Sequence, residues 1–461
     1  MTMKRVLAAM LALVMAFGLM TIGCTPTASA DAEPRTITIG VWWDFYYDST
    51  HESEESDPAY SGSLSDQMRF ENVKYVEEKY NVRFEYVNMT YAGVKESINT
   101  SILAGTPDCD VYLCELAFGI PAAISGLAMD LKTVLPADAD ILSDQTVLSY
   151  LDLGDGKASL MKQVKAENAV EATYPLAFNV EMLEDNNLED PRELYARGEW
   201  TWDKFIEYCQ VLTQDTDGDG VTDQYGFDGF SKDVLGQLML SNGASIASGT
   251  TETLSSAATG EVLQFYSDLF NTYNVAAPYE FGDTGDVMRF RYREGKVGFW
   301  PGAAWIASTN ADYDWDGSVG STLEFETAYV QWPVGPSGNQ ETNKGKFTAG
   351  SFWLIPNGVE DPEFVYEVFE AVSNWYHDDV SIRDDKETMW WWYAVTAGDE
   401  DLQEENFQVM FDMGTREQFD LWDSVNVEMD LESLIRGDMT AAQMQETYRQ
   451  EYQAGLDAYF G

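Results

Sequence analysis

The sequence predicts an α/β protein with more than one hydrophobic core. Strand-like and helix-like segments alternate between residues 36 and 114, and 45% of the 461 residues are hydrophobic whereas 23% are charged. A chain of this length and apolar content can form two or three sizeable cores, and it is too apolar for a disordered acidic tail. We therefore expect a folded body in which helices cover the faces of sheets.

The alternation begins with a buried strand over 36–42 and an amphipathic helix over 67–80. A second strand over 82–87, a helix over 94–103 and a third strand over 110–114 follow. The apolar residues in these segments recur with the periods typical of strands and helices. Because right-handed crossovers place the helices of such a unit on the sheet faces, this region predicts a mostly parallel sheet.

The remaining expected elements are spread over the rest of the chain. We expect helices over 202–212, 260–271, 362–376 and 441–459, and short strands over 296–300 and 326–332. Trp200 and Trp202 stand where the first of these helices begins, and we expect both to pack there. The sequence shows neither an internal repeat nor a low-complexity linker, so composition alone marks no domain boundary.

The charge balance argues against several classes of function. The chain has 79 Asp and Glu residues against 27 Lys and Arg residues, a net charge of −52. Such a polyanion repels nucleic acids and acidic membrane surfaces, so we expect no nucleic-acid partner. The only histidines are His51 and His377, which excludes a His-rich zinc site and limits catalysis by a His base to these two side chains.

The first segment has the features of an export signal. Lys4 and Arg5 precede an apolar run over 6–20, which is shorter than the roughly 20 residues that a bilayer span needs. We therefore interpret 1–23 as a signal peptide. No later stretch is long and apolar enough for a second span, so the mature body is expected to be soluble.

Two cleavage sites are open after this signal. Residues 21–24, Thr-Ile-Gly-Cys, resemble a bacterial lipobox, and we favour lipidation of Cys24 as the membrane anchor of an extracytoplasmic protein. Ala-Ser-Ala at 28–30 fits ordinary cleavage, which would give a freely secreted form. The three remaining cysteines are expected to be buried, reduced thiols. Within a strand-like stretch, Cys109 and Cys114 are expected to point to opposite faces.

An acidic loop is the strongest local motif. Its ligand positions 1, 3, 5, 7 and 9 are Asp215, Asp217, Asp219, Val221 (through its carbonyl) and Asp223. Gly220 at position 6 permits a sharp turn, and this oxygen set suits a structural calcium ion, Ca2+. Gly226 stands at position 12, where an EF-hand has Glu, so the loop is EF-like only; Asp228 would replace that Glu only if the loop bent differently. The alternative is a solvated turn rich in Asp and Gly.

Aromatic and acidic side chains follow two of the predicted strands. Trp42, Trp43 and Asp44 leave the first strand, and Glu115 follows the third. Open α/β sheets bind ligands at this end of their strands. Sugar rings stack on aromatic faces, and their hydroxyl groups need acceptors such as carboxylates. These four residues are therefore candidate ligand-binding residues, with one of the two adjacent tryptophans expected to pack inward.

Several motifs occur in an order that resembles a known family. They are the lipobox-like start, Gly-Thr-Pro-Asp at 105–108, Tyr174-Pro175 with Phe178-Asn179, Trp-Thr-Trp-Asp-Lys-Phe at 200–205, Gly-Lys-Val-Gly-Phe-Trp-Pro-Gly-Ala-Ala-Trp at 295–305, Pro-Val-Gly-Pro-Ser at 333–337, Phe-Thr-Ala-Gly-Ser-Phe-Trp-Leu-Ile-Pro at 347–356, and Arg-Gly-Asp-Met-Thr at 436–440. With these motifs the chain resembles family 1 extracellular solute-binding proteins of ABC importers, the group that includes maltose-binding protein.

The resemblance implies a two-lobed periplasmic-binding-protein-like fold with a hinge of three crossing segments. The crossings map near 174–178, 347–351 and 395–400. Lobe 1 would comprise 36–172 and 352–395, and lobe 2 would comprise 178–347 and 400–461. In this architecture, hinge motion closes the lobes around a ligand.

The resemblance also implies three further ligand-binding residues. Trp305 occupies the place of a stacking tryptophan in relatives, Phe178 follows the first crossing, and Trp422 lies in a late segment that borders the family's cleft.

These observations predict a monomeric receptor and no enzyme. The receptor would capture a neutral carbohydrate, an oligosaccharide, and present it to the transmembrane subunits of an ABC permease. The enzyme alternative is a secreted glycoside hydrolase with an Asp/Glu pair. A polyamine, peptide or metal-chelate binder and a calcium-stabilised scaffold also stay open.

Overall fold

The computed structural model describes the larger part of the chain. The described residues are 33–42, 64–143, 157–161, 175–248, 250–281, 285–302, 323, 325–340, 343, 346–347, 352–383, 400–414, 417–418, 425 and 427–460. The chain divides into two units, 1–35 and 36–461. All elements below belong to the second unit, apart from the first residue of β1.

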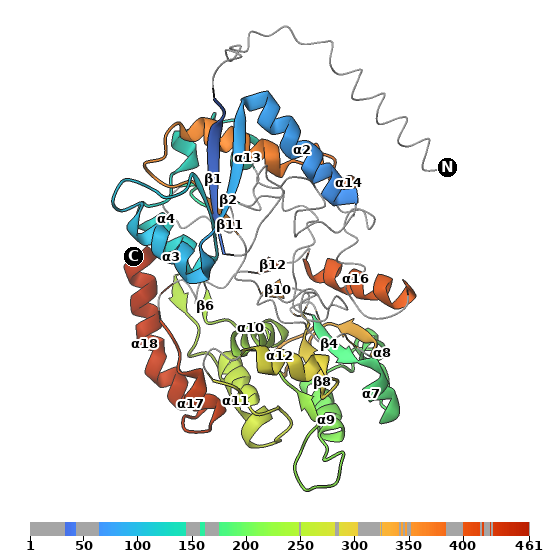
Figure 1. The fold of residues 1–461 in the computed structure, drawn as a ribbon. Coiled ribbons are helices and arrows are strands. Elements are labelled where there is room, and N and C mark those ends of the chain that lie inside the picture. Colours follow the sequence, from blue (N-terminus) through green and yellow to red (C-terminus); the bar gives the residue numbers. More distant parts are fainter. Residues whose placement is uncertain are drawn as a thin grey trace. The chain divides into compact units, whose positions relative to one another are not determined.

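The first sheet has four strands in the order β11-β3-β1-β2 (Figure 1). Their bounds are β1 (Arg35–Val41), β2 (Val82–Asn88), β3 (Val111–Cys114) and β11 (Phe352–Leu354). Strands β1 and β3 run parallel, with Ile39 opposite Val111. Strand β11 runs antiparallel to β3, with Phe352 opposite Cys114.

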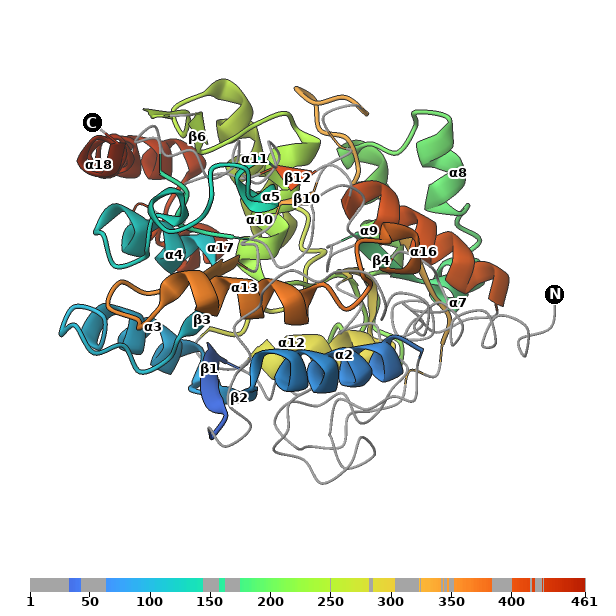
Figure 2. The ribbon, with the colours of Figure 1, turned by 90° about the horizontal axis from the view of Figure 1, so that it is seen from above.

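Helices cover both faces of the first sheet. They are α2 (Leu64–Tyr80), α3 (Thr90–Thr100), α4 (Leu116–Ile124) and α13 (Pro362–Ser373). Val111 and Leu113 of β3 belong to the core with α2 and α13, whereas Tyr112 belongs to the core with α3 and α4. This alternation is the period of two that a strand imposes. Helices α2 and α13 lie side by side (Figure 2). Asn72 of α2 donates hydrogen bonds of 3.0 Å to the Ala371 and Val372 carbonyls of α13.

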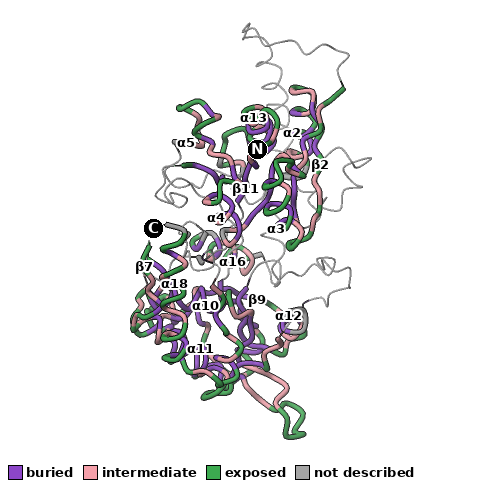
Figure 3. The backbone as a smooth tube through the Cα atoms, turned by 90° about the vertical axis from the view of Figure 1, so that its left-hand side faces the viewer, coloured by how far each residue is buried: buried purple, intermediate pink, exposed green. Residues whose placement is uncertain are grey.

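The second sheet has four strands in the order β5-β8-β4-β9. Their bounds are β4 (Leu176–Asn179), β5 (Tyr225–Phe227), β8 (Val297–Pro301) and β9 (Thr327–Val330). Strands β5 and β8 run parallel, whereas β4 runs antiparallel to both β8 and β9. Every residue of β4, β8 and β9 is buried. Figure 3 shows that the buried residues lie inside and that the exposed residues lie on the outer loops.

Two cores flank the second sheet, one on each face. The helices around it are α7 (Val180–Asp185), α8 (Pro191–Ala196), α9 (Trp202–Leu212), α10 (Ser231–Ser241), α11 (Ala257–Asn271), α12 (Gly285–Arg293), α16 (Glu400–Gly414), α17 (Leu431–Ile435) and α18 (Ala441–Phe460). The larger core joins α9, α10, α11 and α18, and the smaller one joins α12 and α16. Asn406 of α16 accepts a hydrogen bond from the Tyr329 amide at 2.7 Å, which ties this helix to β9.

The remaining elements are short. They are η2 (Leu131–Thr133), α5 (Asp140–Ser143), β6 (Ala247–Ser248) paired with β7 (Thr251–Glu252), β10 (Lys346–Phe347) paired with β12 (Glu417–Gln418), and α14 (Val380–Arg383). Within the described part of the chain, no helix has both the length and the apolar character that a bilayer crossing requires.

The expected helices and strands are confirmed, with ends that shift by a few residues. Trp200 and Trp202 pack at the start of α9, 1% and 5% exposed. The predicted parallel pairing within 36–114 is confirmed for β1 and β3. Strand β11, from 352–354, joins this sheet antiparallel to β3, so the complete sheet is mixed. In the second sheet, which that prediction did not concern, β4 runs antiparallel to β8 and β9.

Cys109, Cys114 and Cys209 are free and buried, as expected. The prediction that Cys109 and Cys114 point to opposite faces is wrong, because β3 begins only at Val111 and both thiols join the same core. Burial raises the pKa of the Cys109 thiol to about 12 and raises that of Cys114 further. These thiols are therefore held in the unreactive protonated form.

Candidate functional site

The carboxyl ends of three strands of the first sheet meet at one edge. Trp42 follows β1 and Glu115 follows β3, and these two strands are parallel neighbours. The Met89 amide, just after β2, donates a hydrogen bond of 2.8 Å to the Val41 carbonyl at the end of β1. The edge at which open α/β sheets bind ligands thus carries side chains from three separate segments.

Three aromatic rings form a contiguous group at this edge. The ring of Tyr91, in the first turn of α3, lies edge-on to Trp42 at 5.6 Å and to Phe118 at 5.6 Å between centroids. Trp42 also lies edge-on to Phe118 at 6.1 Å. Phe118 is buried, Trp42 is partly buried, and Tyr91 is 43% exposed. We call Trp42, Tyr91, Glu115 and Phe118 the edge cluster.

The carboxylate of Glu115 is the acidic member of the edge cluster. Its Oε2 accepts a hydrogen bond of 2.9 Å from the Tyr91 hydroxyl. Glu115 is also the N-cap residue of α4, but its side chain makes no capping hydrogen bond. The carboxylate is therefore directed toward the aromatic group and not toward the amides of its own helix. Tyr91 was not among the residues predicted from the sequence, and only its place after the second strand could have indicated it.

Two buried or partly buried carboxylates lie at the corresponding end of the second sheet. Asp228 follows β5, is 3% exposed, and forms an ion pair of 3.0 Å with Arg291. Burial raises the pKa of Asp228 to about 7 against the attraction of Arg291. Loss of hydration also raises the pKa of Asp233, in the first turn of α10, to about 7, and the negative charge of Glu115 acts in the same direction.

The other predicted ligand residues divide into two groups. Trp43, Asp44, Trp305 and Trp422 lie outside the described residues, as does Cys24. Phe178 is 2% exposed, and its ring packs 6.2 Å from that of Phe299 in the larger core of the second sheet. Phe178 is thus a core side chain in this structure, because β4 runs through the middle of a sheet that is covered on both faces.

The acidic loop brings three of its four carboxylates together. Oxygen atoms of Asp215, Asp217 and Asp223 lie within 4.8 Å of one another. Asp215 accepts hydrogen bonds of 2.7 Å from the Gly218 and Gly220 amides, and both glycines have positive φ. Hydrogen bonds from the backbone and side chain of Thr216 lower the pKa of Asp223. Three carboxylate oxygen donors at this spacing suit a hard cation such as calcium.

Two other predicted ligands of the loop have local roles in this structure. The Oδ1 of Asp219 accepts the Val221 amide at 2.7 Å, and Asp219 is not part of the three-carboxylate group. At the twelfth position, a Cβ on Gly226 would lie 2.4 Å from the Cα of Cys209. The Cys209 backbone therefore leaves no room for a side chain at this position. The loop also runs directly into β5 and not into the second helix of an EF-hand. Asp228 is committed to Arg291 and does not replace the missing Glu.

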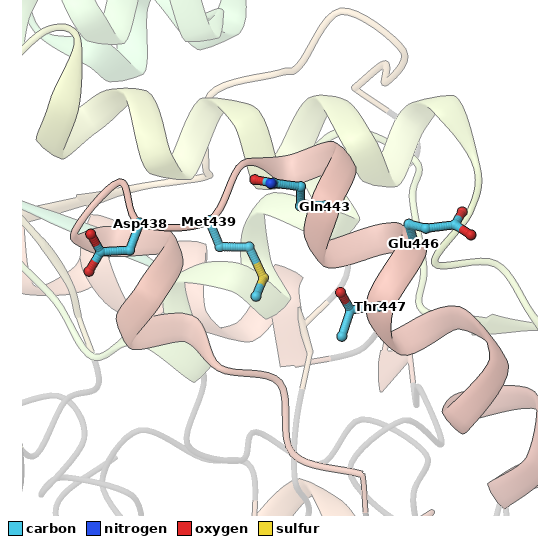
Figure 4. Close-up of a pocket in the computed structure, with 5 residues that line it drawn as sticks. All are labelled: Asp438, Met439, Gln443, Glu446 and Thr447. Carbon is cyan, nitrogen blue, oxygen red and sulfur yellow. The ribbon is translucent and has the colours of Figure 1, made fainter.

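A separate surface hollow of about 240 Å³ lies beside α18 (Figure 4). Asp438 and Met439 in the turn before α18, and Gln443, Glu446 and Thr447 on its first turns, line the hollow. None of these five side chains is aromatic, so the hollow does not offer the stacking surface that characterises the edge cluster.

The two mixed sheets with their covering helices define a two-lobed α/β fold. A model of the bacterial extracellular solute-binding protein family matches residues 72–364, more than half of the chain. The chain belongs to this family, whose members bind solutes outside the cytoplasm and are not enzymes. A search of curated protein sequences gave no match.

Solved structures share the fold. An ABC substrate-binding protein from Listeria monocytogenes in complex with cycloalternan aligns with a TM-score of 0.62 and 15% identity, over 92% of this chain and 99% of that chain. The GacH receptor of Streptomyces glaucescens, solved unliganded and with acarbose, aligns with a TM-score of 0.61 and 16% identity, over 92% and 99%. MalE from Bdellovibrio bacteriovorus, bound to maltotriose, gives 0.57 and 13%, over 92% and 99%. At these identities the likeness concerns the fold.

Proposed function

We propose that this protein is the receptor of an ABC importer and captures a neutral carbohydrate, an oligosaccharide, for delivery to a permease. The edge cluster is the observation that carries the proposal. It combines a partly buried indole, an exposed phenol ring and a carboxylate at the ligand-binding edge of a sheet. Aromatic faces suit the C–H surfaces of a sugar, and a carboxylate accepts its hydroxyl groups.

The charge of the protein favours an uncharged ligand over an anionic one. A net charge of −52 repels anions, whereas a neutral sugar avoids this repulsion. The solved relatives with cycloalternan, acarbose and maltotriose add support, because each holds a carbohydrate or a carbohydrate-like compound on the same fold. A cationic polyamine is the competing ligand that the charge also favours.

We further propose the lobe boundaries 36–172 with 352–395 and 178–347 with 400–461. The composition of the sheets supports this division, since one sheet takes its strands from residues 35–114 and 352–354 and the other from 176–330. A ligand that contacts both lobes only when they are closed shifts the protein toward the closed form. The permease would recognise that form.

The membrane attachment in this proposal is a lipid on Cys24, and the receptor acts as a monomer. An anchor is needed because the negative charge of the protein does not favour an acidic bilayer surface. We also propose a structural calcium ion at Asp215, Asp217 and Asp223, supported by the spacing of their oxygens. The ion would neutralise the mutual repulsion of these carboxylates.

Mass spectrometry of the ligand released from freshly purified, denatured protein tests the proposal. We expect a neutral oligosaccharide, and intrinsic tryptophan fluorescence should change when that sugar is added back. Incubation should yield no cleavage products, since a binding protein returns its ligand unaltered. Release of a polyamine, or accumulation of shortened sugars, would reject the proposed function.

A further inference from the structure

We propose that Tyr91 is a specificity-determining ligand contact, which stacks on a sugar ring and orients Glu115 toward a sugar hydroxyl. This inference rests on the proposed function and extends it to a residue that the sequence did not single out. Three features of Tyr91 lead to it: the strained turn before it, the rings that fix its orientation, and the hydrogen bond from its hydroxyl.

The turn before Tyr91 is strained. Thr90 has φ of 63°, a left-handed conformation that β-branched residues rarely adopt. The Thr90 amide donates to Asn88 Oδ1 at 3.0 Å, and Thr90 Oγ1 accepts the Gly93 amide at 3.3 Å. These local bonds hold the turn, and they start α3 directly after β2. Backbone strain of this kind clusters at ligand-binding positions, so it justifies looking for a function at the next residue.

The ring of Tyr91 is held in a defined orientation while part of it stays exposed. Two edge-on contacts, to Trp42 at 77° and to Phe118 at 87°, fix its plane. The side chain is nevertheless 43% exposed at the edge where three strands end. A ring that is both oriented and accessible offers a stacking surface with little conformational entropy left to lose on binding.

The hydroxyl of Tyr91 sets the position of Glu115. It donates to Oε2 at 2.9 Å, and a carboxylate has about four acceptor sites on its two oxygens. The phenol thus holds one oxygen of the carboxylate in place at the sheet edge, where a ligand hydroxyl could donate to the same group. The ring of Tyr91 and the carboxylate of Glu115 together favour a ligand that has a hydroxyl donor next to a C–H face. A neutral sugar has this combination.

Two substitutions separate the ring from the hydroxyl. Affinity for maltotriose, the probe, would be measured by isothermal titration calorimetry on the full chain. Tyr91→Phe keeps the ring and removes the donor, so we expect an affinity about tenfold weaker, typical for the loss of a hydrogen bond to a charged group. Tyr91→Ala removes both, and we expect a loss of at least about thirtyfold, on the scale of an interface hot spot.

The matched control is Tyr75→Ala. Tyr75 is a 56% exposed tyrosine on α2, where it lies 5.7 Å from the Lys79 ammonium. Its removal should leave maltotriose affinity unchanged, and thermal melts of all three variants should stay close to that of the wild type.

The outcomes distinguish this inference from the proposed function. Wild-type affinity in Tyr91→Ala overturns the ligand contact, and wild-type affinity in Tyr91→Phe overturns the positioning of Glu115, while the receptor function stands in both cases. If the wild-type protein binds spermidine and does not bind maltotriose, both proposals are overturned.

Discussion

Aromatic rings serve two different purposes in the two sheets. At the edge of the first sheet, Trp42 and Tyr91 keep part of their surface exposed beside a carboxylate. In the larger core of the second sheet, Phe178, Trp200 and Phe299 are at most 2% exposed. The centroid of Phe299 lies 6.2 Å from that of Phe178 and 5.8 Å from that of Trp200, which is close to the distances in the edge cluster. Aromatic content therefore does not identify a binding site. Trp42 and Tyr91 lie just beyond β1 and β2, whereas Phe178 and Phe299 lie within strands.

The physical reason lies in how a covered sheet treats its residues. Side chains in the middle of a strand point into one of the two flanking cores. Residues just beyond a strand can leave the layered region, as the partly buried Trp42 does after β1, although Asp228 after β5 stays buried. Phe178 belongs to the first kind and Trp42 to the second.

The largest effect that tests this comparison concerns stability. Phe178→Ala should lower the free energy of unfolding by about 4 kcal/mol, because it leaves a cavity in a packed core. Urea denaturation measures this change. The fraction that stays folded should bind ligand with wild-type affinity; a selective loss of affinity at normal stability would return Phe178 to the ligand surface.

The acidic loop extends the comparison to carboxylates. Asp215 and Asp217 are exposed and Asp223 is partly exposed, whereas Glu115 accepts a hydrogen bond from Tyr91 of the edge cluster. Calcium at a hundred times its Kd should stabilise the fold by about 3 kcal/mol, and chelation should lower the melting temperature. Asp217→Asn should abolish this response, whereas Asp219→Asn, outside the group, should largely keep it. An identical melt with and without excess EDTA would leave the loop as a solvated turn.

Ligand affinity tests the edge of the first sheet. Trp42→Ala should weaken binding by about 2 kcal/mol, and we expect the same for Trp305→Ala, which lies outside the described residues. Fluorescence titration with the released ligand measures both. Trp42→Phe keeps an aromatic face and serves as the control. Unchanged affinity in either Ala variant would remove that residue from the site.

The second sheet also predicts a pH dependence of stability. Since the pKa of Asp228 is raised to about 7 in the folded protein, the folded state binds this proton more tightly than the unfolded state. The resulting contribution to stability is complete below about pH 4, the ordinary range of Asp, and is lost as the pH rises through 7.

Asp228→Asn should remove that slope. Urea denaturation at several pH values between 4.5 and 7.5 measures it, and Asp185→Asn, an exposed site at the end of α7, is the control. Parallel curves for wild type and Asp228→Asn would show that Asp228 titrates normally, with its charge fully balanced by Arg291.

The sequence predicted most elements because their signals are local. The amphipathic period of α9 and the cap residues at its start lie within a few residues of one another, and the structure confirms its bounds. The strand directions were not predictable in the same way. The direction of β4 depends on β8 and β9, which follow it by more than a hundred residues.

The candidate site was predictable in part. Trp42 and Glu115 could be placed at a ligand-binding edge, because each directly follows a strand with a clear pattern. Tyr91 could not, since its role depends on a left-handed Thr90 and on two rings from other segments. Phe178 was placed at the ligand surface by its motif, and only the central position of β4 shows that its ring is buried.

The sequence by itself determined the class of fold, the negative charge and the acidic spacing of the loop, because each follows from composition or from neighbouring residues. The tertiary structure alone decided which aromatic rings are exposed, which carboxylates lie together, and that Asp228 pairs with Arg291 and not with the loop. Burial and partnership are properties of contacts between distant segments, and no local pattern encodes them.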